Sequence, residues 1–417
     1  MKRRVAVTGI GLVCPLGDSC EEVFANAHAG RSAVRRLDAT DPAFAPFAAR
    51  LHAPLAAPTR FDPTAHFDPP RLRMLDRVAQ FALVASRSAL ADAGGAHAAF
   101  DAARRGVFVG TGMAGTLSND EGYRTLYGEA SDRIKPYTVL LGMHNASAGW
   151  IAIEQGWTGP SLTYSTACSS SAVAIGEAFK RIADGELDMA LAGGAEAPLS
   201  LGSMKAWEAL HTLAAVDAAD PSASCKPFAA NRSGMVLGEG AAMLVLEAWD
   251  AALARGATPL GEVIGYGLTT DAGHITKPSV AGQAQAMRAA LASAGLATSD
   301  IDAINAHGTG TAANDAVETA AIKAVFGAHA SRLPISATKA IHGHLLGAAG
   351  ALEAALSLLA MRHRALLPTC HLALPDPLCD LDYVSSGARD GVDVRTMLSN
   401  SFAFGGTNAV LALRSSA

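Results

Sequence analysis

Charged and aromatic residues are scarce in this sequence, and paired cysteines are missing. Of the 417 residues, 17% are charged and 6% are aromatic, and the formal net charge is −5. This charge gives no support to nucleic-acid binding, which depends on a basic surface. The six cysteines form no C-x-x-C pair and no zinc-type spacing. We therefore expect a reduced, cytoplasmic protein with no nucleic-acid partner.

Long apolar runs are also missing, and no stretch reaches the length that spans a membrane. The beginning, MKRRVAVTGIGLVCPLG, has the basic and apolar character of a signal peptide. However, its apolar run is short, is broken by glycines and Pro15, and lacks a small-x-small cleavage site. We interpret residues 5–8 as a first β-strand and expect no membrane association.

The abundant residues predict a tightly packed α/β enzyme. Half of the residues are hydrophobic and 41 are glycine, which is typical of compact proteins. Strand-like runs such as GVFVGTG alternate with helix-like runs such as residues 74–93, and this alternation favours helices packed on mostly parallel sheets. The irregular segment 34–70 is interpreted as a surface loop or cap.

Cys168 occupies the point where a strand pattern becomes a helix pattern, in SLTYSTACSSSAVAIGEAFKR. A helix N-terminus carries positive partial charge, which eases deprotonation of a thiol to the nucleophilic thiolate. Small neighbours allow a tight turn of the nucleophile-elbow kind. The alternative is a small buried hydrophobe without chemistry.

The second half repeats this pattern in LPISATKAIHGHLLGAAGALEAALSLL, with His344 in the place of Cys168. We interpret this as a duplication, with halves at 1–255 and 256–417. Lys339, His342 and His344 crowd one loop, and Glu353 follows on an apolar helix. An unpaired carboxylate there would be costly, so Glu353 should have a cation or hydrogen-bond donors nearby.

Two further loops carry chemistry-bearing residues. In INAHGTGTAANDAVETAAI, His307 follows a strand at 301–306, where α/β proteins place their sites, and Thr309 and Thr311 offer hydroxyls. A surface histidine is the alternative. In LSNSFAFGGTNAVLAL, two strands flank a turn whose backbone N–H groups can face an oxyanion, although an ordinary hairpin fits as well. The G-x-G-x-x-G spacing of GTGMAG lacks the context of a dinucleotide site.

In chain order, TACSSS, HGTGT, a lysine five residues before the histidine of GHLLGAAG, and NSFAFGGTN resemble one family over nearly the whole chain. The sequence resembles the elongating β-ketoacyl-acyl carrier protein synthases of the synthase II type. The resemblance implies a thiolase-like fold, in which duplicated α/β halves form α-β-α-β-α layers. It also implies decarboxylative condensation of an acyl group on Cys168 with a malonyl-carrier.

Residue roles follow from the resemblance. His307 and His344 would stabilise the enolate, and Lys339 would pair with Glu318. The N–H groups of Cys168 and Phe404 would form an oxyanion hole, with Phe404 as a gate. The other implied contacts are with substrate at Thr309, Thr311, Phe402, Gly405 and Met143; with the carrier at Arg71, Arg73, Arg133 and Lys135; and with a monovalent cation at Asn305, Glu353, Ser399 and Asn400.

The resemblance implies no cofactor, since substrates arrive on the phosphopantetheine of acyl carrier protein. It implies a homodimer, or a heterodimer with a ketosynthase-like subunit. The sequence departs from the usual pattern at Ala403, at Met74 and Glu208 on the docking face, and at residues 143–145 on the expected dimer face and pocket wall. These departures favour a polyene or polyketide pathway over bulk fatty-acid synthesis. A thiolase is the less favoured interpretation, because Cys370 and Cys379 lack the C-x-G setting of a second catalytic cysteine. A non-catalytic chain-length subunit is also less favoured, because it would lack Cys168.

Overall fold

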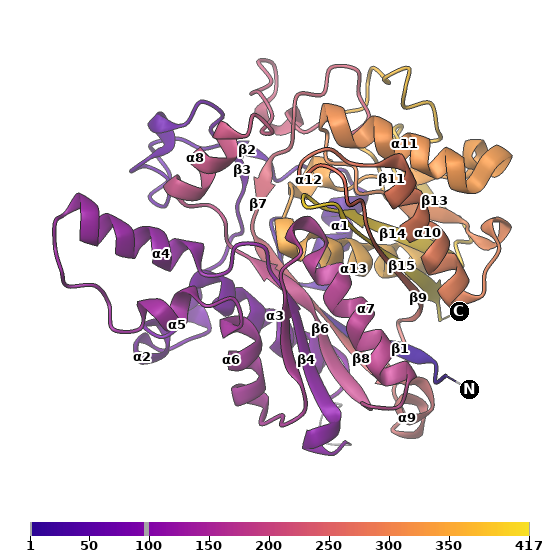
Figure 1. Ribbon diagram of the computed structural model, residues 1–417, viewed down its shortest axis with the longest axis horizontal. Helices are drawn as coiled ribbons and strands as arrows, with labels where there is room; N and C mark the ends of the chain where they lie inside the picture. The colour runs from indigo at the N-terminus through magenta and orange to yellow at the C-terminus, as the bar shows by residue number, and fades with distance from the viewer. Residues whose placement is uncertain (1, 96–99, 417) are drawn as a thin grey trace.

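A computed structural model describes residues 2–95 and 100–416 (Figure 1). Its main feature is one sheet with the strand order β11-β10-β14-β15-β9-β1-β8-β6-β4-β5. The first half supplies β1 (Val5–Val13), β4 (Arg105–Gly110), β5 (Ser161–Tyr164), β6 (Met189–Glu196) and β8 (Gly240–Ala248). The second half supplies β9 (Gly261–Thr270), β10 (Ala303–Asn305), β11 (Ile335–Ser336), β14 (Thr396–Phe402) and β15 (Thr407–Ser415).

The two halves have the same strand topology. In each half, the second strand along the chain (β4 or β10) pairs in parallel with the two strands that follow it in the large sheet. The last strand (β8 or β15) is antiparallel to both of its neighbours within its own half. The halves join where β1 pairs with β9 through three residue pairs. The duplication inferred from the sequence is therefore visible in the fold.

Helices complete five layers. The apolar faces of α7 (Ser170–Ala183) and α13 (Ala349–Arg362) pack together in one core with the inner faces of both halves of the sheet. α3 (Arg77–Asp92) and α6 (Ala146–Gln155) cover the outer face of the first half. α10 (Val280–Ala294) and α11 (Ala312–Phe326) cover the outer face of the second. This arrangement confirms the expected α-β-α-β-α layers of a thiolase-like fold.

The smaller elements connect the main ones, and one of them, at Lys339–His342, is buried. They are α1 (Cys20–His28), α2 (Pro69–Leu72), α4 (Thr116–Tyr123), α5 (Thr138–Gly142), α8 (Leu201–Ala209), α9 (Trp249–Ala254), α12 (Lys339–His342), β12 (Ala365–Leu366) and β13 (Arg389–Asp390). β2 (Arg35–Arg36), β3 (Leu55–Ala57) and β7 (Leu237–Gly238) form a small separate sheet. Because β3 is buried, segment 34–70 is more than the surface loop expected. Among the described residues, no helix combines the length and apolarity needed to cross a membrane.

The two halves place equivalent turns at the centre of the molecule. After β5, a 3-10 turn at Ala167–Ser169 leads into α7, and after β11 a 3-10 turn at Leu346–Ala348 leads into α13. Ala167 and Leu346 both have positive φ angles, 50° and 45°, which side-chain-bearing residues rarely adopt. These matched turns bring the Cys168 and His344 segments into contact.

Candidate active site

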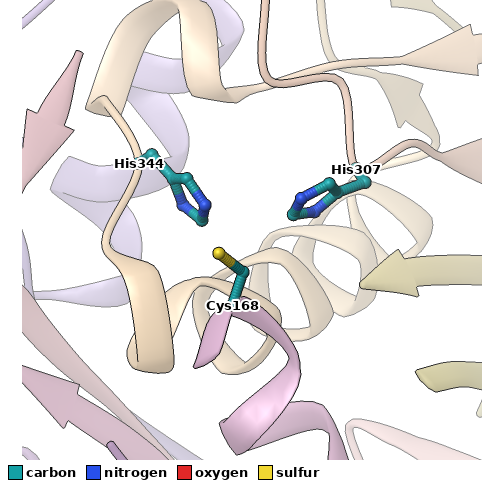
Figure 2. Close-up of side chains that lie close together, drawn as sticks. All are labelled: Cys168, His307 and His344. Atoms are coloured by element: carbon teal, nitrogen blue, oxygen red, sulfur yellow. The ribbon is translucent and has the colours of Figure 1, made fainter. Parts of the chain in front are cut away.

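Cys168, His307 and His344 converge between the two halves. The Cys168 sulfur and a ring nitrogen of each histidine all lie within 4.8 Å of one another. The two imidazole rings are nearly perpendicular, with centroids 5.4 Å apart, and Figure 2 shows both rings turned toward the sulfur. All three residues are buried, at 5% exposure or less. The structure therefore joins the three residues that the sequence analysis placed in separate loops.

The thiol of Cys168 is not acidified as the helix N-terminus predicted. Burial raises the pKa of Cys168 to about 12, and this effect exceeds the lowering by the nearby Lys339 charge. The backbone N–H groups of Phe404 and of Cys168 itself also interact with the sulfur and lower its pKa by less. The prediction of an easily formed thiolate is therefore wrong for this closed pocket, because the helix end cannot replace the water that burial removes.

Each histidine has one ring nitrogen engaged by a donor. Nδ1 of His344 accepts from the Leu346 N–H at 3.2 Å, and Nδ1 of His307 lies 3.3 Å from the Lys339 ammonium. These contacts assign the ring proton of each histidine to Nε2. Burial, followed by the Lys339 charge, holds the pKa of both rings well below the usual value. The site therefore contains two neutral imidazoles.

Lys339 forms its ion pair with Glu353 and not with Glu318. Its Nζ donates to Oε1 of Glu353, and both side chains are 1% exposed. The ammonium also donates to the His307 carbonyl at 2.6 Å. The pairing of Lys339 with Glu318, which the resemblance implied, is therefore wrong. The expectation that Glu353 has a cation nearby is confirmed.

Glu318 instead anchors the backbone of the His307 loop. Its two carboxylate oxygens accept from the N–H groups of His307 and Gly308 at 2.8 and 2.9 Å. The side-chain amides of Asn314 and Asn400 complete its shell. Burial raises the pKa of Glu318, and these donors oppose that shift. Glu318 is thus a loop anchor one layer away from the reacting groups.

A cavity leads from the surface to Cys168. Thr309, Thr311, Phe402 and Phe404 line it with the three central residues, and the two threonine hydroxyls lie 2.9 Å apart. Gly405 does not line the cavity but anchors its rim, because its N–H donates to the Ile275 carbonyl at 2.8 Å. The β14–β15 turn that carries Phe404 has the two flanking strands that the sequence predicted.

Some pocket residues were missed and one was misplaced. Loop 271–278 supplies much of the cavity mouth, but the sequence analysis did not single it out. Met143 is 38% exposed and, with His144 and Asn145, lies on the surface link between α5 and α6. It does not line the cavity of its own chain. Residues 143–145 therefore do not contribute to the pocket wall of their own chain, and their expected place on a dimer face stays a prediction.

Aromatic and thioether side chains lie on the other side of Cys168. The rings of Trp207 and Phe404 stack with centroids 6.0 Å apart, and the Trp207 indole N–H donates to the Met113 sulfur at 3.4 Å. Trp207 and Met113 pack on the same apolar cluster as Cys168. The sequence analysis also missed this wall, because no local pattern links residues 113 and 207.

The four residues considered for a monovalent cation have buried oxygens without partners. Asn305 and Ser399 lie directly opposite each other on β10 and β14. Asn305 Oδ1, Glu353 Oε2, Ser399 Oγ and Asn400 Oδ1 have no hydrogen-bond partner in the described parts of the chain. Buried polar atoms are normally satisfied, and carboxylate and carbonyl oxygens suit hard cations. The donor set therefore fits such a cation.

The basic docking residues are only partly free. Arg73 and Lys135 line one surface cavity beside α2 and α5, but Lys135 pairs with Glu121 at 2.7 Å. Arg71 lies over the Trp150 ring and faces Glu154, whereas Arg133 is exposed.

Glu208 has a structural role on this face. Its carboxylate accepts from the backbone N–H groups of His52 and Ala53 and pairs with Lys205. These donors neutralise Glu208 within its own chain, so it need not repel an acidic carrier.

Two duplicated α/β halves with one cysteine and two histidines between them define a thiolase-like condensing enzyme. Sequence models of the β-ketoacyl synthase N-terminal and C-terminal domains match residues 2–252 and 260–373. The chain belongs to the β-ketoacyl synthase family and is an acyltransferase.

Full-length relatives agree with this family. The chain is 42% identical to nodulation protein E of Rhizobium meliloti strain 1021 over 414 residues, which cover 99% of this chain and all of that protein. It is 37% identical to 3-oxoacyl-[acyl-carrier-protein] synthase 2 of Staphylococcus aureus strain COL, covering 99% and 98% of the two chains. The solved ishigamide ketosynthase/chain length factor superposes with a TM-score of 0.90 at 34% identity over the whole of both chains.

Proposed function

We propose that this enzyme elongates a carrier-bound acyl chain by two carbons, with Cys168 as the acyl acceptor and His307 and His344 as the pair that drives decarboxylation. The observation that carries the proposal is the convergence of the three side chains within 4.8 Å. A two-domain division near residue 255 accompanies it, with the nucleophile in residues 1–255 and both histidines in 256–417.

In the first half-reaction, the Cys168 sulfur attacks the carbonyl carbon of the acyl thioester. A new carbon–sulfur bond forms, the bond to the phosphopantetheine sulfur breaks, and the thiol proton passes to that leaving sulfur. The tetrahedral oxyanion between these events would accept from the N–H groups of Cys168 and Phe404. The interaction of both groups with the sulfur supports this role.

In the second half-reaction, malonyl-carrier loses carbon dioxide, and the electron pair of the broken bond forms an enolate. The Nε2–H groups of His307 and His344 would donate to the enolate oxygen. The enolate carbon then attacks the Cys168 thioester, and collapse of the adduct releases the sulfur, which regains a proton. Lys339 supports this step by holding Nδ1 of His307, so that the ring proton stays on Nε2.

The chemistry as proposed uses no organic cofactor, because decarboxylation itself supplies the carbanion. Asn305, Glu353, Ser399 and Asn400 would hold a monovalent cation beside the Lys339–Glu353 pair. Such a cation would supply positive charge to the Glu353 carboxylate, whose pKa burial raises to about 7. Thr309, Thr311 and Phe402 would contact the phosphopantetheine arm in the cavity. Six free cysteines support a reducing, cytoplasmic location.

Acyl carrier protein would dock on Arg73, Arg133 and Lys135, with a smaller share for Arg71. The relative in Staphylococcus aureus carries this partner in its name. Carrier proteins are acidic, so exposed cations here would steer the encounter. Because Arg71 and Lys135 already have acidic neighbours, the free charge of this patch is concentrated on Arg73 and Arg133.

A second ketosynthase-like chain would cover the face formed by α4, α5, α6 and β5. β5 is an edge strand of the sheet, and large apolar side chains are exposed around it. They are Tyr123, Tyr127, Ile134, Tyr137, Val139, Leu140, Met143, Ile153 and Leu162. An exposed apolar area of this kind marks a protein interface. The partner is either a second copy or, as in the ishigamide ketosynthase, a chain length factor.

We also propose that the acyl chain belongs to a specialised pathway that makes a polyene or a polyketide. The motive is the Trp207–Phe404 stack beside Cys168, since a flat conjugated chain stacks well on aromatic rings. The 30% identity with a solved type II PKS ketosynthase, over the whole of both chains, supports it. Competition between saturated and conjugated acyl-carriers tests it, and a strong preference for long saturated chains would contradict it.

The central test is mass spectrometry of the protein after incubation with acyl-carrier. We expect one acyl group on Cys168, and no acyl group and no condensation product with Cys168→Ala. Cys14→Ala is the matched control, because Cys14 is also a buried free thiol. Elongation by the folded Cys168→Ala variant would overturn the proposal.

A further inference from the structure

Glu196 is a buried carboxylate that the reaction as proposed does not use. It ends β6 and is 0% exposed. One of its oxygens accepts from the Thr111 hydroxyl at 3.1 Å and the Met113 N–H at 3.0 Å. The other accepts from the Gly112 N–H at 2.6 Å and the Gly347 N–H at 2.9 Å. Four donors thus saturate a group whose burial would otherwise be unfavourable.

The Gly347 bond crosses from the first half of the chain to the second. Gly347 lies three residues after His344 and in direct contact with the loop at residue 112, because a Cβ atom on Gly347 would lie 2.3 Å from the Gly112 nitrogen. Glu196 therefore ties the loop after β4 to the segment that carries His344.

The same segment determines the tautomer of His344. The Leu346 N–H donates to Nδ1 of His344, and Leu346 holds this N–H in place with a φ of 45°. A side-chain-bearing residue keeps such a conformation only when its surroundings enforce it. The neighbouring Gly347 N–H is fixed by Glu196, so the carboxylate supplies that restraint one residue away.

We propose that Glu196 is a positioning residue for His344: by holding the Gly347 N–H it maintains the turn at Leu346, and thereby keeps the His344 proton on Nε2, facing the Cys168 sulfur and the enolate. This inference rests on the proposed donor role of His344. The four donors of Glu196 include no atom of Cys168, His307 or His344, so its proposed effect on His344 passes through the 344–347 segment.

Glu196→Gln is the sharpest variant. Glutamine keeps the shape of glutamate but has an NH₂ group in place of one carboxylate oxygen. This NH₂ group is itself a donor, so it cannot accept from the two donors that bind the replaced oxygen. Thr111→Val is milder for Glu196, because it removes only one of the four bonds to the carboxylate, although it also removes the acceptor of the Ala114 N–H. Glu247→Gln is the matched control: Glu247 is also 0% exposed and fully engaged, by Arg255 and Thr8, but its partners lie outside the His344 segment.

Two readouts decide the proposal. The first is the ¹⁵N NMR signature of the His344 ring, assigned by comparison with His344→Asn, which reports the tautomer without any substrate. The second is the split between Cys168 acylation by acyl-carrier and carbon dioxide release from malonyl-carrier. In Glu196→Gln we expect loss of the pure Nε2–H signature and a fall in decarboxylation of about tenfold or more, with acylation within about threefold. Glu247→Gln should keep both readouts.

An unchanged His344 tautomer in folded Glu196→Gln would overturn the proposal, as would equal losses in acylation and decarboxylation. If Glu196→Gln does not fold, Thr111→Val decides by the same readouts, with an expected fall in decarboxylation of about two- to fivefold. Failure of the proposed function would look different. In that case His344→Ala would leave decarboxylation unchanged while the tautomer readout of Glu196→Gln still responded.

Discussion

The ammonium group of Lys339 lies 3.3 Å from Nδ1 of His307. Burial is the larger cause of the low pKa of His307, and the fixed cation at this position adds to it, because it excludes a proton from Nδ1 and opposes formation of an imidazolium. Lys339 does not reach the substrate, but it helps to keep the histidine that faces the substrate neutral, with its proton on Nε2.

We predict that decarboxylation of malonyl-carrier shows no acid limb with a midpoint near pH 6.5. The lowered pKa values of His307 and His344 keep both rings neutral as pH falls through the range where free histidine gains a proton. Carbon dioxide release measured between pH 5.5 and 8 checks this, with circular dichroism at each pH to control for unfolding. A titration centred at 6.5 in folded protein would contradict the assigned charge state.

Asparagine should replace either histidine better than alanine does. Alanine removes the hydrogen-bond donor and should lower decarboxylation by about a hundredfold or more, whereas asparagine retains one N–H. The measurement is carbon dioxide release by His307 and His344 variants. Wild-type rates in both alanine variants would exclude the two histidines from this step.

Cys168 should react as an ordinary, buried thiol. Because burial raises its pKa to about 12, the thiolate fraction increases tenfold per pH unit below that value. The iodoacetamide labelling rate of the Cys168 peptide should therefore rise between pH 6 and 9 without a plateau. Cys370, whose pKa burial raises to about 11, provides an internal comparison. A plateau near neutral pH would indicate a preformed thiolate.

Replacement of Lys339 should destabilise the folded protein, and the size of this effect should depend on whether Glu353 is charged. Lys339→Met leaves a buried carboxylate without its cation, and we expect a loss of about 3–5 kcal/mol in the free energy of unfolding. The double variant Lys339→Met/Glu353→Gln should recover part of this loss. Lys339→Met combined with Glu318→Gln is the control and should show no recovery. Urea denaturation measures all three, and equal recovery by both double variants would contradict the assigned pair.

Removal of small monovalent cations should lower the melting temperature. Asn305, Glu353, Ser399 and Asn400 present unpartnered oxygens, and a bound ion would stabilise the folded state by mass action. Thermal unfolding in potassium or sodium chloride, against tetramethylammonium chloride at equal ionic strength, tests this. Glu353→Gln should reduce the difference, and identical melting in all salts would rule out the cation.

Local patterns predicted more of this protein than long-range contacts did. The turns carrying Cys168 and His344 are marked by small residues between a strand and a helix, so their equivalence could be seen in the sequence. The partner of Lys339 could not, because Glu318 and Glu353 both lie on helices and only packing decides which one faces the ammonium. The acidity expected for Cys168 failed for the same reason, since the number of atoms covering a thiol is set by the whole fold.

The matched topology of the two halves shows that the fold of each half does not depend on which reactive side chain it carries. Cys168 lies in the first half, both His307 and His344 lie in the second, and the strand topology of the two halves is the same. A descendant that lost the cysteine would keep every packing layer and the exposed face around β5. Selection could then retain this inactive chain as a partner that shapes the product of the active enzyme. An inactive partner subunit is therefore a natural outcome of this architecture.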